Sequence, residues 1–363
     1  MSFSGSYREG EVEFLLTPLP LQDFVDVADK EYLIQSGQRH YSEMLSPEVL
    51  PSQRYLDVFR QACAANNDRM ARDCLTLAAL IAARRDGAIT VVSLARAGTP
   101  VGVVLTRLLN GVLERQAHHY SVSIIRDRGI DSNALAYILA QGHAAASLVF
   151  VDGWTGKGVI AAELRSTIAT FNASHGTAID GGLYVLSDLA GTAACAASCD
   201  DYLIPSSILN ATVSGLVSRS ILNASIGPGQ FHGCVVYQQF AAHDQSQAFA
   251  DAIVAAAEAQ LSAGEGMQAA PSDQARAAAV SRAYMQAALR QHGIDDVNLV
   301  KPGIGEATRV LLRRTPRLLI VRDGGARDVA HLLLLAQEKQ VPMLVDGALP
   351  YHAVSLIRSA LDA

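Results

Sequence analysis

Two glycine-containing turns, each directly after an apolar run, carry the residues best suited to chemistry. In LVFVDGWTGKG (residues 148–158) the run ends near Asp152 and the turn contains Lys157. In VVSLARAGTP (residues 91–100) the turn contains Arg96. Glycines let the backbone approach a ligand, and free N–H groups at a helix start favour a phosphate. The pair of turns therefore predicts a site for a ligand with two phosphate groups. The alternative is two tight turns whose glycines serve only backbone geometry.

The segments between residues 89 and 240 alternate between short apolar runs and longer helical patterns. Such alternation favours an α/β fold, with a mainly parallel sheet covered on both faces. In these sheets ligands bind beyond the carboxyl ends of the strands, where both turns lie. The predicted strands are residues 89–94, 120–126, 148–152, 183–187, 201–204 and 234–239, and the predicted helices are residues 100–114, 132–141 and 157–171.

A second, smaller domain is predicted at the C-terminus. Residues 262–273 combine small residues, Gly and Pro without apolar periodicity, as is typical of a linker. We therefore expect one domain over residues 1–261 and another over residues 274–363. The second domain reads as a small α/β sandwich, with strands at 318–321 and 343–345 and helices at 274–291, 305–313 and 326–340.

Composition narrows the class of protein. Half of the 363 residues are hydrophobic and 18% are charged, which excludes a disordered chain. No apolar run reaches membrane-spanning length, and the first residues have no signal pattern, so we expect a cytoplasmic protein without a membrane partner. The five cysteines fit a reduced compartment. From residue 274 onward twelve Lys and Arg stand against eight Asp and Glu, a net charge of +4 on an acidic body, which points to an anionic partner for that part.

The two turns resemble the pyrophosphate loop and the phosphoribosyl-pyrophosphate (PRPP) loop of type I phosphoribosyltransferases. The resemblance implies a type I phosphoribosyltransferase-like sheet with a hood. It also implies PRPP as substrate and Mg²⁺ bridging pyrophosphate and ribose oxygens, without a direct metal motif in the protein beyond a contact from Asp152. The implied catalytic residues are Asp152, Arg96 and Lys157, and the implied PRPP-binding residues are Ala95, Ala97, Gly98, Gly153, Thr155, Gly156 and Gly158.

One departure from that family concerns the ribose clamp. Gly153 stands where these enzymes carry a second acidic residue. Either another carboxylate (Asp127, Asp131 or Asp188) substitutes for it, or the domain binds its ligand without standard turnover.

A resemblance over nearly the whole chain is more specific. KEYLIQSGQRHYSEML (residues 30–45), SLARAGTPVGVVL, FVDGWTGKG and residues 200–222 are together similar to a bacterial family of tellurium-resistance and stress-response gene clusters. Its members join a phosphoribosyltransferase domain to a C-terminal pelota-type domain, and a nucleoside-like product is implied. Some relatives carry a cysteine-protease label.

Residues 300–345 resemble the ribosomal L7Ae, L30e and pelota RNA-binding group. That resemblance implies RNA contacts from Gly303, Glu306, Arg309 and Arg313. Gly305 replaces the Asn of the family motif, so the amide that would read a base is missing, and the arginines would attract phosphates without reading sequence. The alternative is a solvated arginine face, with the domain docked on the first one.

Two further sets of residues have both a functional and a structural interpretation. His40, Glu43, Ser214 and Arg219 could form a hood over an acceptor, or could serve a capped turn and loop packing. Cys195 and Cys199 lie four residues apart without a second cysteine pair, which favours small buried residues over zinc ligands. A cysteine protease needs a histidine beside its thiol, and no pattern ties His175 or His232 to a cysteine.

The sequence therefore predicts an enzyme: Mg²⁺-dependent transfer of a phosphoribosyl group from PRPP to an unidentified, base-like acceptor, in synthesis of a nucleoside-like metabolite. A non-catalytic protein that senses PRPP or a nucleotide and binds RNA through its C-terminal domain is the main alternative, and a cysteine protease is the third. The acceptor, the RNA target and the oligomeric state are not encoded in any motif.

Overall fold

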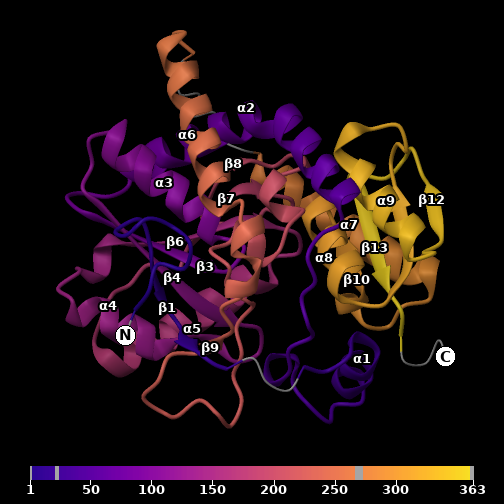
Figure 1. Cartoon of the computed structure of the whole chain (residues 1–363), viewed down its shortest axis with the longest axis horizontal. Helices are drawn as coiled ribbons and strands as arrows, with labels where there is room; N and C mark the ends of the chain where they lie inside the picture. The colour runs from indigo at the N-terminus through magenta and orange to yellow at the C-terminus, as the bar shows by residue number, and fades with distance from the viewer. Residues whose placement is uncertain (1, 21–23, 266–272, 360–363) are drawn as a thin grey trace.

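The computed structural model describes residues 2–20, 24–265 and 273–359, and it places a central sheet beside a smaller C-terminal domain (Figure 1). In the sheet, β1, β4, β3, β6, β7 and β8 lie side by side in that order, and every neighbouring pair is parallel. The short β5 pairs antiparallel with β4. This arrangement confirms the predicted α/β class. The strands are β1 (Glu13–Leu15), β3 (Ile89–Ala95), β4 (Ala117–Ile125), β5 (Gly129–Ile130), β6 (Leu148–Thr155), β7 (Leu183–Asp188) and β8 (Cys195–Ser198).

Helices cover both faces of the sheet because its central strands are apolar on both sides. Val91 and Val92 are adjacent in β3 yet belong to different buried clusters, since successive strand residues point to opposite faces. One face packs against α2 (Gln53–Ala83) and α3 (Thr99–Gly111), and α6 (Ser246–Ser262) packs in turn on these two helices. The other face packs against α4 (Ser132–Ala140) and α5 (Val159–His175).

The C-terminal domain contains a four-stranded sheet in the order β10, β13, β11, β12. Strand β13 is antiparallel to both neighbours, and β11 is parallel to β12. Helix α7 begins where the sequence suggests, since the Asp273 side chain accepts a hydrogen bond from Arg276 N (3.0 Å), and it ends before Gly293 at φ 61°. The elements are α7 (Gln274–His292), β10 (Val300–Pro302), α8 (Ile304–Arg313), β11 (Pro316–Val321), α9 (Ala330–Glu338), β12 (Met343–Val345) and β13 (Ala353–Ile357).

Two predicted strands differ from the structure, and one helix was not predicted. The helix α2 was not predicted, although Ser52 caps it by accepting a hydrogen bond from Tyr55 N (3.2 Å). The segment 201–204 is not a strand, because the edge of the sheet is formed by β8 instead. Of the predicted strand 234–239, only β9 (Gly233–Cys234) forms, and it pairs with β2 (Thr17–Pro18) away from the main sheet. Most of the predicted linker, residues 266–272, lies outside the described residues.

The two domains are joined by polar contacts as well as by chain continuity. Asp201 accepts hydrogen bonds from the backbone N–H groups of Ile304 (2.9 Å) and His352 (2.7 Å). On the short helix α1 (Val27–Gln35), Glu31 forms a two-bond pair with Arg314, each bond 2.6 Å long. These contacts set α8 against the carboxyl edge of the main sheet. Within the described part of the chain no helix is long and apolar enough to cross a membrane.

Candidate functional site: two basic cavities between the domains

A cleft of about 300 Å³ lies between the carboxyl end of β6 and helix α8. Both domains and α1 supply its walls, and most of its charged side chains are basic. The acidic residues of the lining are Asp152 and Glu306, and the basic ones are Lys30, Arg126, Lys157, Arg219, Lys301, Arg309, Arg313 and Arg314. We call this space the interdomain cleft. Its excess of positive charge favours an anionic ligand.

Asp152 lies buried at the floor of the interdomain cleft. Its Oδ1 accepts a hydrogen bond from Gly153 N (2.8 Å). Burial raises the pKa of this carboxyl to about 6, although the nearby Arg309 acts in the opposite direction. Trp154 follows on the same strand, and the Arg309 guanidinium lies 4.4 Å from its ring centroid.

The glycine turn after β6 is engaged with the C-terminal domain. Thr155 Oγ1 accepts a hydrogen bond from Gly158 N (3.1 Å), and Lys157 Nζ donates to Val297 O (2.7 Å). A Cβ on Gly156 would lie 3.0 Å from Glu306 Cγ, so this glycine permits close approach of the two domains. Lys157 loses much of its hydration in this position, and burial lowers its pKa to about 7.

Helix α8 brings three of the four residues that were predicted to bind RNA, Glu306, Arg309 and Arg313, to this cleft. Gly303, at φ 91°, precedes the helix, and Glu306 accepts hydrogen bonds from Arg309 (2.7 Å) and Trp154 Nε1 (3.4 Å). The absence of a side chain at Gly305 is required by packing, because a Cβ there would lie 2.4 Å from Trp154 Cε2. Arg313 lines this cleft and also a second cavity, where its guanidinium donates to Asn210.

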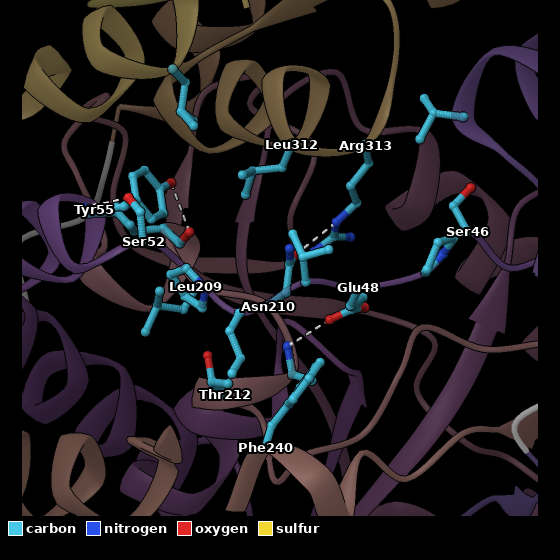
Figure 2. Close-up of a pocket in the computed structure, with 18 of the residues that line it drawn as sticks. Ser46, Glu48, Ser52, Tyr55, Leu209, Asn210, Thr212, Phe240, Leu312 and Arg313 are labelled. Carbon is cyan, nitrogen blue, oxygen red and sulfur yellow. Dashed lines mark hydrogen bonds between the residues drawn. The ribbon is translucent and has the colours of Figure 1, made fainter. Parts of the chain in front are cut away.

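The second cavity, about 370 Å³, lies on the other side of Arg313 and is shown in Figure 2. Arg96, at the end of β3, donates to Asn210 Oδ1 (3.2 Å) and Val217 O (2.8 Å) and pairs with Glu48 Oε1 (2.6 Å). Arg313 donates to the same Asn210 oxygen from the opposite domain, its Nε at 2.9 Å. Because arginines converge here, we call it the arginine cavity.

The other residues of the glycine turn after β3 contact the protein core and do not line either cavity. Ala95 ends β3, and Ala97 packs partly buried against the main core cluster. A Cβ on Gly98 would lie 2.7 Å from Val151 O, so this glycine allows α3 to begin close to β6. The turn therefore places Arg96 directly behind Glu48 and Asn210, two residues of the cavity wall, whereas the neighbouring residues serve the strand-to-helix packing.

Of the four residues predicted to form a hood, the fold brings Arg219 to the segment that carries His40 and Glu43, whereas Ser214 bonds elsewhere. Arg219 lines both cavities and donates to the carbonyl oxygens of Tyr41 (2.8 Å) and Met44. Glu43 instead pairs with Arg128 (2.5 Å). His40 Nδ1 contacts Ser42 Oγ (2.8 Å), and Ser214 Oγ donates to Asn210 O (2.9 Å).

Several residues of the two cavities were missed by sequence reasoning. Glu48 lies in no motif, and Lys30, Asn210 and Lys301 lie in stretches used only for resemblance. No local spacing connects them, since Arg313 and Asn210 are 103 residues apart and meet only after the domains dock. Among the described residues, no group of three or more His, Cys, Asp or Glu side chains is arranged to hold a metal ion. The expected Mg²⁺ depended on a bound substrate and stays a prediction.

Fold and cavities together define a two-domain α/β protein with a basic site between its domains. Residues 5–254 match the family described as "Tellurite-like stress resistance cysteine protease StiP", and residues 279–359 match the PELOTA RNA binding domain. A relative from Acinetobacter baylyi (strain ATCC 33305 / BD413 / ADP1), named "Cysteine protease StiP", is 40% identical over 98% of this chain and 94% of its own. The chain belongs to this stress-resistance family. No solved structure matches it.

These comparisons correct the predicted activity. The family and the relative are named as cysteine proteases, which are hydrolases, so the prediction of a PRPP-dependent phosphoribosyltransferase is wrong. The contacts of Gly156 and Lys157 supply a physical reason for the error, because the turn that resembles a phosphate loop also fits domain docking. The predicted link to tellurium resistance and stress, and the pelota-type second domain, are confirmed. The likeness of the sheet to a phosphoribosyltransferase sheet stays a prediction.

Proposed function

We propose that this stress-resistance protein binds single-stranded RNA in the interdomain cleft. The observation that carries the proposal is the convergence of basic side chains from both domains on one cleft, with α8 of the pelota domain as one wall. Phosphate contacts of Lys and Arg supply most of the affinity of proteins for nucleic acids. The missing amide at Gly305 removes a base-reading group, so binding is expected to depend weakly on sequence.

The size of the cleft selects the form of RNA. A space of about 300 Å³ accepts roughly one nucleotide at a time, which excludes a duplex and fits an unpaired end or a looped-out base. Arg126 and Arg309 keep 29% and 31% of their side-chain surface exposed and, unlike Arg314, are not held by a two-bond ion pair, so they are the side chains to test for phosphate contacts.

Fluorescence anisotropy with a labelled single-stranded RNA of about 12 nucleotides tests this proposal. The double variant Arg126→Ala/Arg309→Ala should bind roughly tenfold more weakly, and the slope of log affinity against log salt should fall by about 1.4, as expected for two lost contacts to a single strand. Arg282→Ala, at an exposed arginine on α7 outside the cleft, is the matched control and should bind as the wild type does. Equal binding by the double variant and the control would exclude the cleft as the RNA site.

We propose peptide hydrolysis as a second candidate function, because the relative is named a cysteine protease. A protease thiol must ionise readily and lie near a base. Burial raises the pKa of the Cys63 and Cys234 thiols to about 12 and also raises those of Cys74 and Cys195, so these four are poor nucleophiles. Cys199 is the remaining cysteine, half-buried on the loop after β8.

The loop of Cys199 contacts a loop that carries a histidine. Asp201 Oδ2 accepts a hydrogen bond from the backbone N–H of His352 (2.7 Å), and burial together with the adjacent Arg322 lowers the pKa of the His352 ring, which keeps the ring neutral as a base must be. Hydrolysis of labelled casein should therefore be lost in Cys199→Ala and in His352→Ala and retained in Cys63→Ala. Loss of hydrolysis in Cys63→Ala, with Cys199→Ala fully active, would reject Cys199 as the nucleophile.

A further inference from the structure

The arginine cavity has a wall made by the chain segment of residues 45–52. This segment contains Pro47 and Pro51, and it exposes the apolar side chains of Val49 (83% exposed) and Leu50 (38%). Glu48 in its middle points the other way, into the cavity, toward Asn210 and Arg313 (Figure 2). The segment is thus held by one inward carboxylate, which two exposed apolar side chains follow directly.

The carboxylate of Glu48 is embedded among cations. Its Oε1 pairs with Arg96 (2.6 Å), and its Oε2 accepts a hydrogen bond from Ala211 N (3.2 Å). The Glu48 side chain keeps 13% of its surface exposed and that of Arg96 only 3%, so little water screens this pair. The cavity lining also contains Glu338 and Lys339, which are adjacent in the sequence and whose opposite charges offset each other.

Positive charge in this region exceeds the single carboxylate that faces it. Arg96 and Arg313 donate to the same amide oxygen of Asn210, which is neutral and offsets neither charge. Arg219 and Lys30 line the same cavity. Three arginines therefore interact with Glu48, and Lys30 adds a further positive charge to the same cavity, an arrangement that is costly without further negative charge.

Hydrogen-bond donors without acceptors indicate where a negatively charged ligand would bind. Arg96 Nε is buried, and it has no acceptor among the described residues. Lys30 keeps only 9% of its surface exposed. Within the part of the chain that the structure describes, its ammonium group has no hydrogen bond or ion pair. Burial and the neighbouring arginines lower the pKa of Lys30 to about 7, and the nearby Glu31 carboxylate opposes this shift only in part.

We propose that the arginine cavity is a binding site for a phosphate group, and that the Glu48 carboxylate occupies it until phosphate displaces it. A phosphate carries nearly two charges and more acceptor oxygens than a carboxylate. It would pair with Arg96, Arg219 and Arg313 at once, whereas Glu48 pairs with Arg96 alone. The segment 45–52 would then turn outward. This site does not depend on RNA binding in the interdomain cleft.

Isothermal titration of the full chain with inorganic phosphate, at constant ionic strength, tests the proposal. Glu48→Gln removes the competing charge and should bind phosphate roughly tenfold more tightly than the wild type. The matched control is Glu11→Gln, because Glu11 pairs with Arg107 at 2.5 Å and keeps 14% of its side-chain surface exposed, without a cavity beside it. Equal phosphate affinity in the wild type and Glu48→Gln, or an equal gain in Glu11→Gln, would overturn the proposal.

A second variant keeps the test decisive if Glu48→Gln folds poorly. Asn210→Asp places a fixed negative charge between Arg96 and Arg313, so the melting temperature should rise and the response to phosphate should be lost. A lower melting temperature in Asn210→Asp would contradict the charge argument. RNA binding, measured with the Arg126 and Arg309 variants, separates the two proposals, since neither residue lines the arginine cavity.

Discussion

Replacing Asp201 by alanine is expected to lower the free energy of unfolding by about 4 kcal/mol. Its two carboxylate oxygens accept hydrogen bonds from Ile304 N at the start of α8 and from His352 N before β13. Without the carboxylate both N–H groups lose their partners where the domains meet, and each unpaired buried group costs about 1–3 kcal/mol. The favourable interaction with the positive end of the α8 dipole is lost as well.

Urea denaturation of the full chain measures this effect. Asp296→Ala is the matched control, because Asp296 also caps a short helical turn of the C-terminal domain, accepting a hydrogen bond from Asn298 N (2.8 Å), but it is exposed. That control should lose at most about 1 kcal/mol. A similar loss in both variants would show that Asp201 is an ordinary cap and that the domains are held by other contacts.

The second large effect is a gain of stability in Asp152→Asn at neutral pH. Burial raises the pKa of Asp152 from 3.8 to about 6, so the folded protein binds this proton more tightly than the unfolded chain does. The stability of the wild type should therefore fall as the pH rises from about 4 to 6 and stay level above that range. Asparagine removes the buried charge and keeps an oxygen for Gly153 N, which should stabilise the fold on the order of 3 kcal/mol at pH 8 and hardly at all near pH 4.

Asp188→Asn provides a control of opposite sign. Asp188 is fully buried and accepts hydrogen bonds from Ala190 N, Thr192 N and Ala193 N, and also from the Gln274 side chain. An amide NH₂ there would face N–H donors, so this variant should lose stability at every pH. Thermal melts of the three proteins between pH 4 and 8 check both expectations. A loss of stability in Asp152→Asn at pH 8 would show that the negative charge of Asp152 stabilises the folded protein, and would contradict this prediction.

The sequence predicted the features that depend on neighbours within a few residues. The alternation of apolar runs and helical patterns gave the α/β class, and the end of helix α7 follows from Gly293 directly after it. The long helix α2 was missed because many polar and charged residues of its exposed side interrupt the apolar residues of its buried side in the sequence. The glycine turn after β6 was found, but its function was not, since the same glycines satisfy a phosphate loop and a domain contact.

Only the tertiary structure decided which charges meet. Arg314 and Glu31 are 283 residues apart, and Arg96 reaches Asn210 across 114 residues. Periodicity and capping act through the backbone of one segment, so they are readable from the local sequence. The balance of charge in a buried cavity depends on which distant side chains are brought together and how far they are removed from water. The sequence thus determined the class of fold and the basic character of the C-terminal part, whereas domain docking determined the two cavities and the place of Glu48 between the arginines.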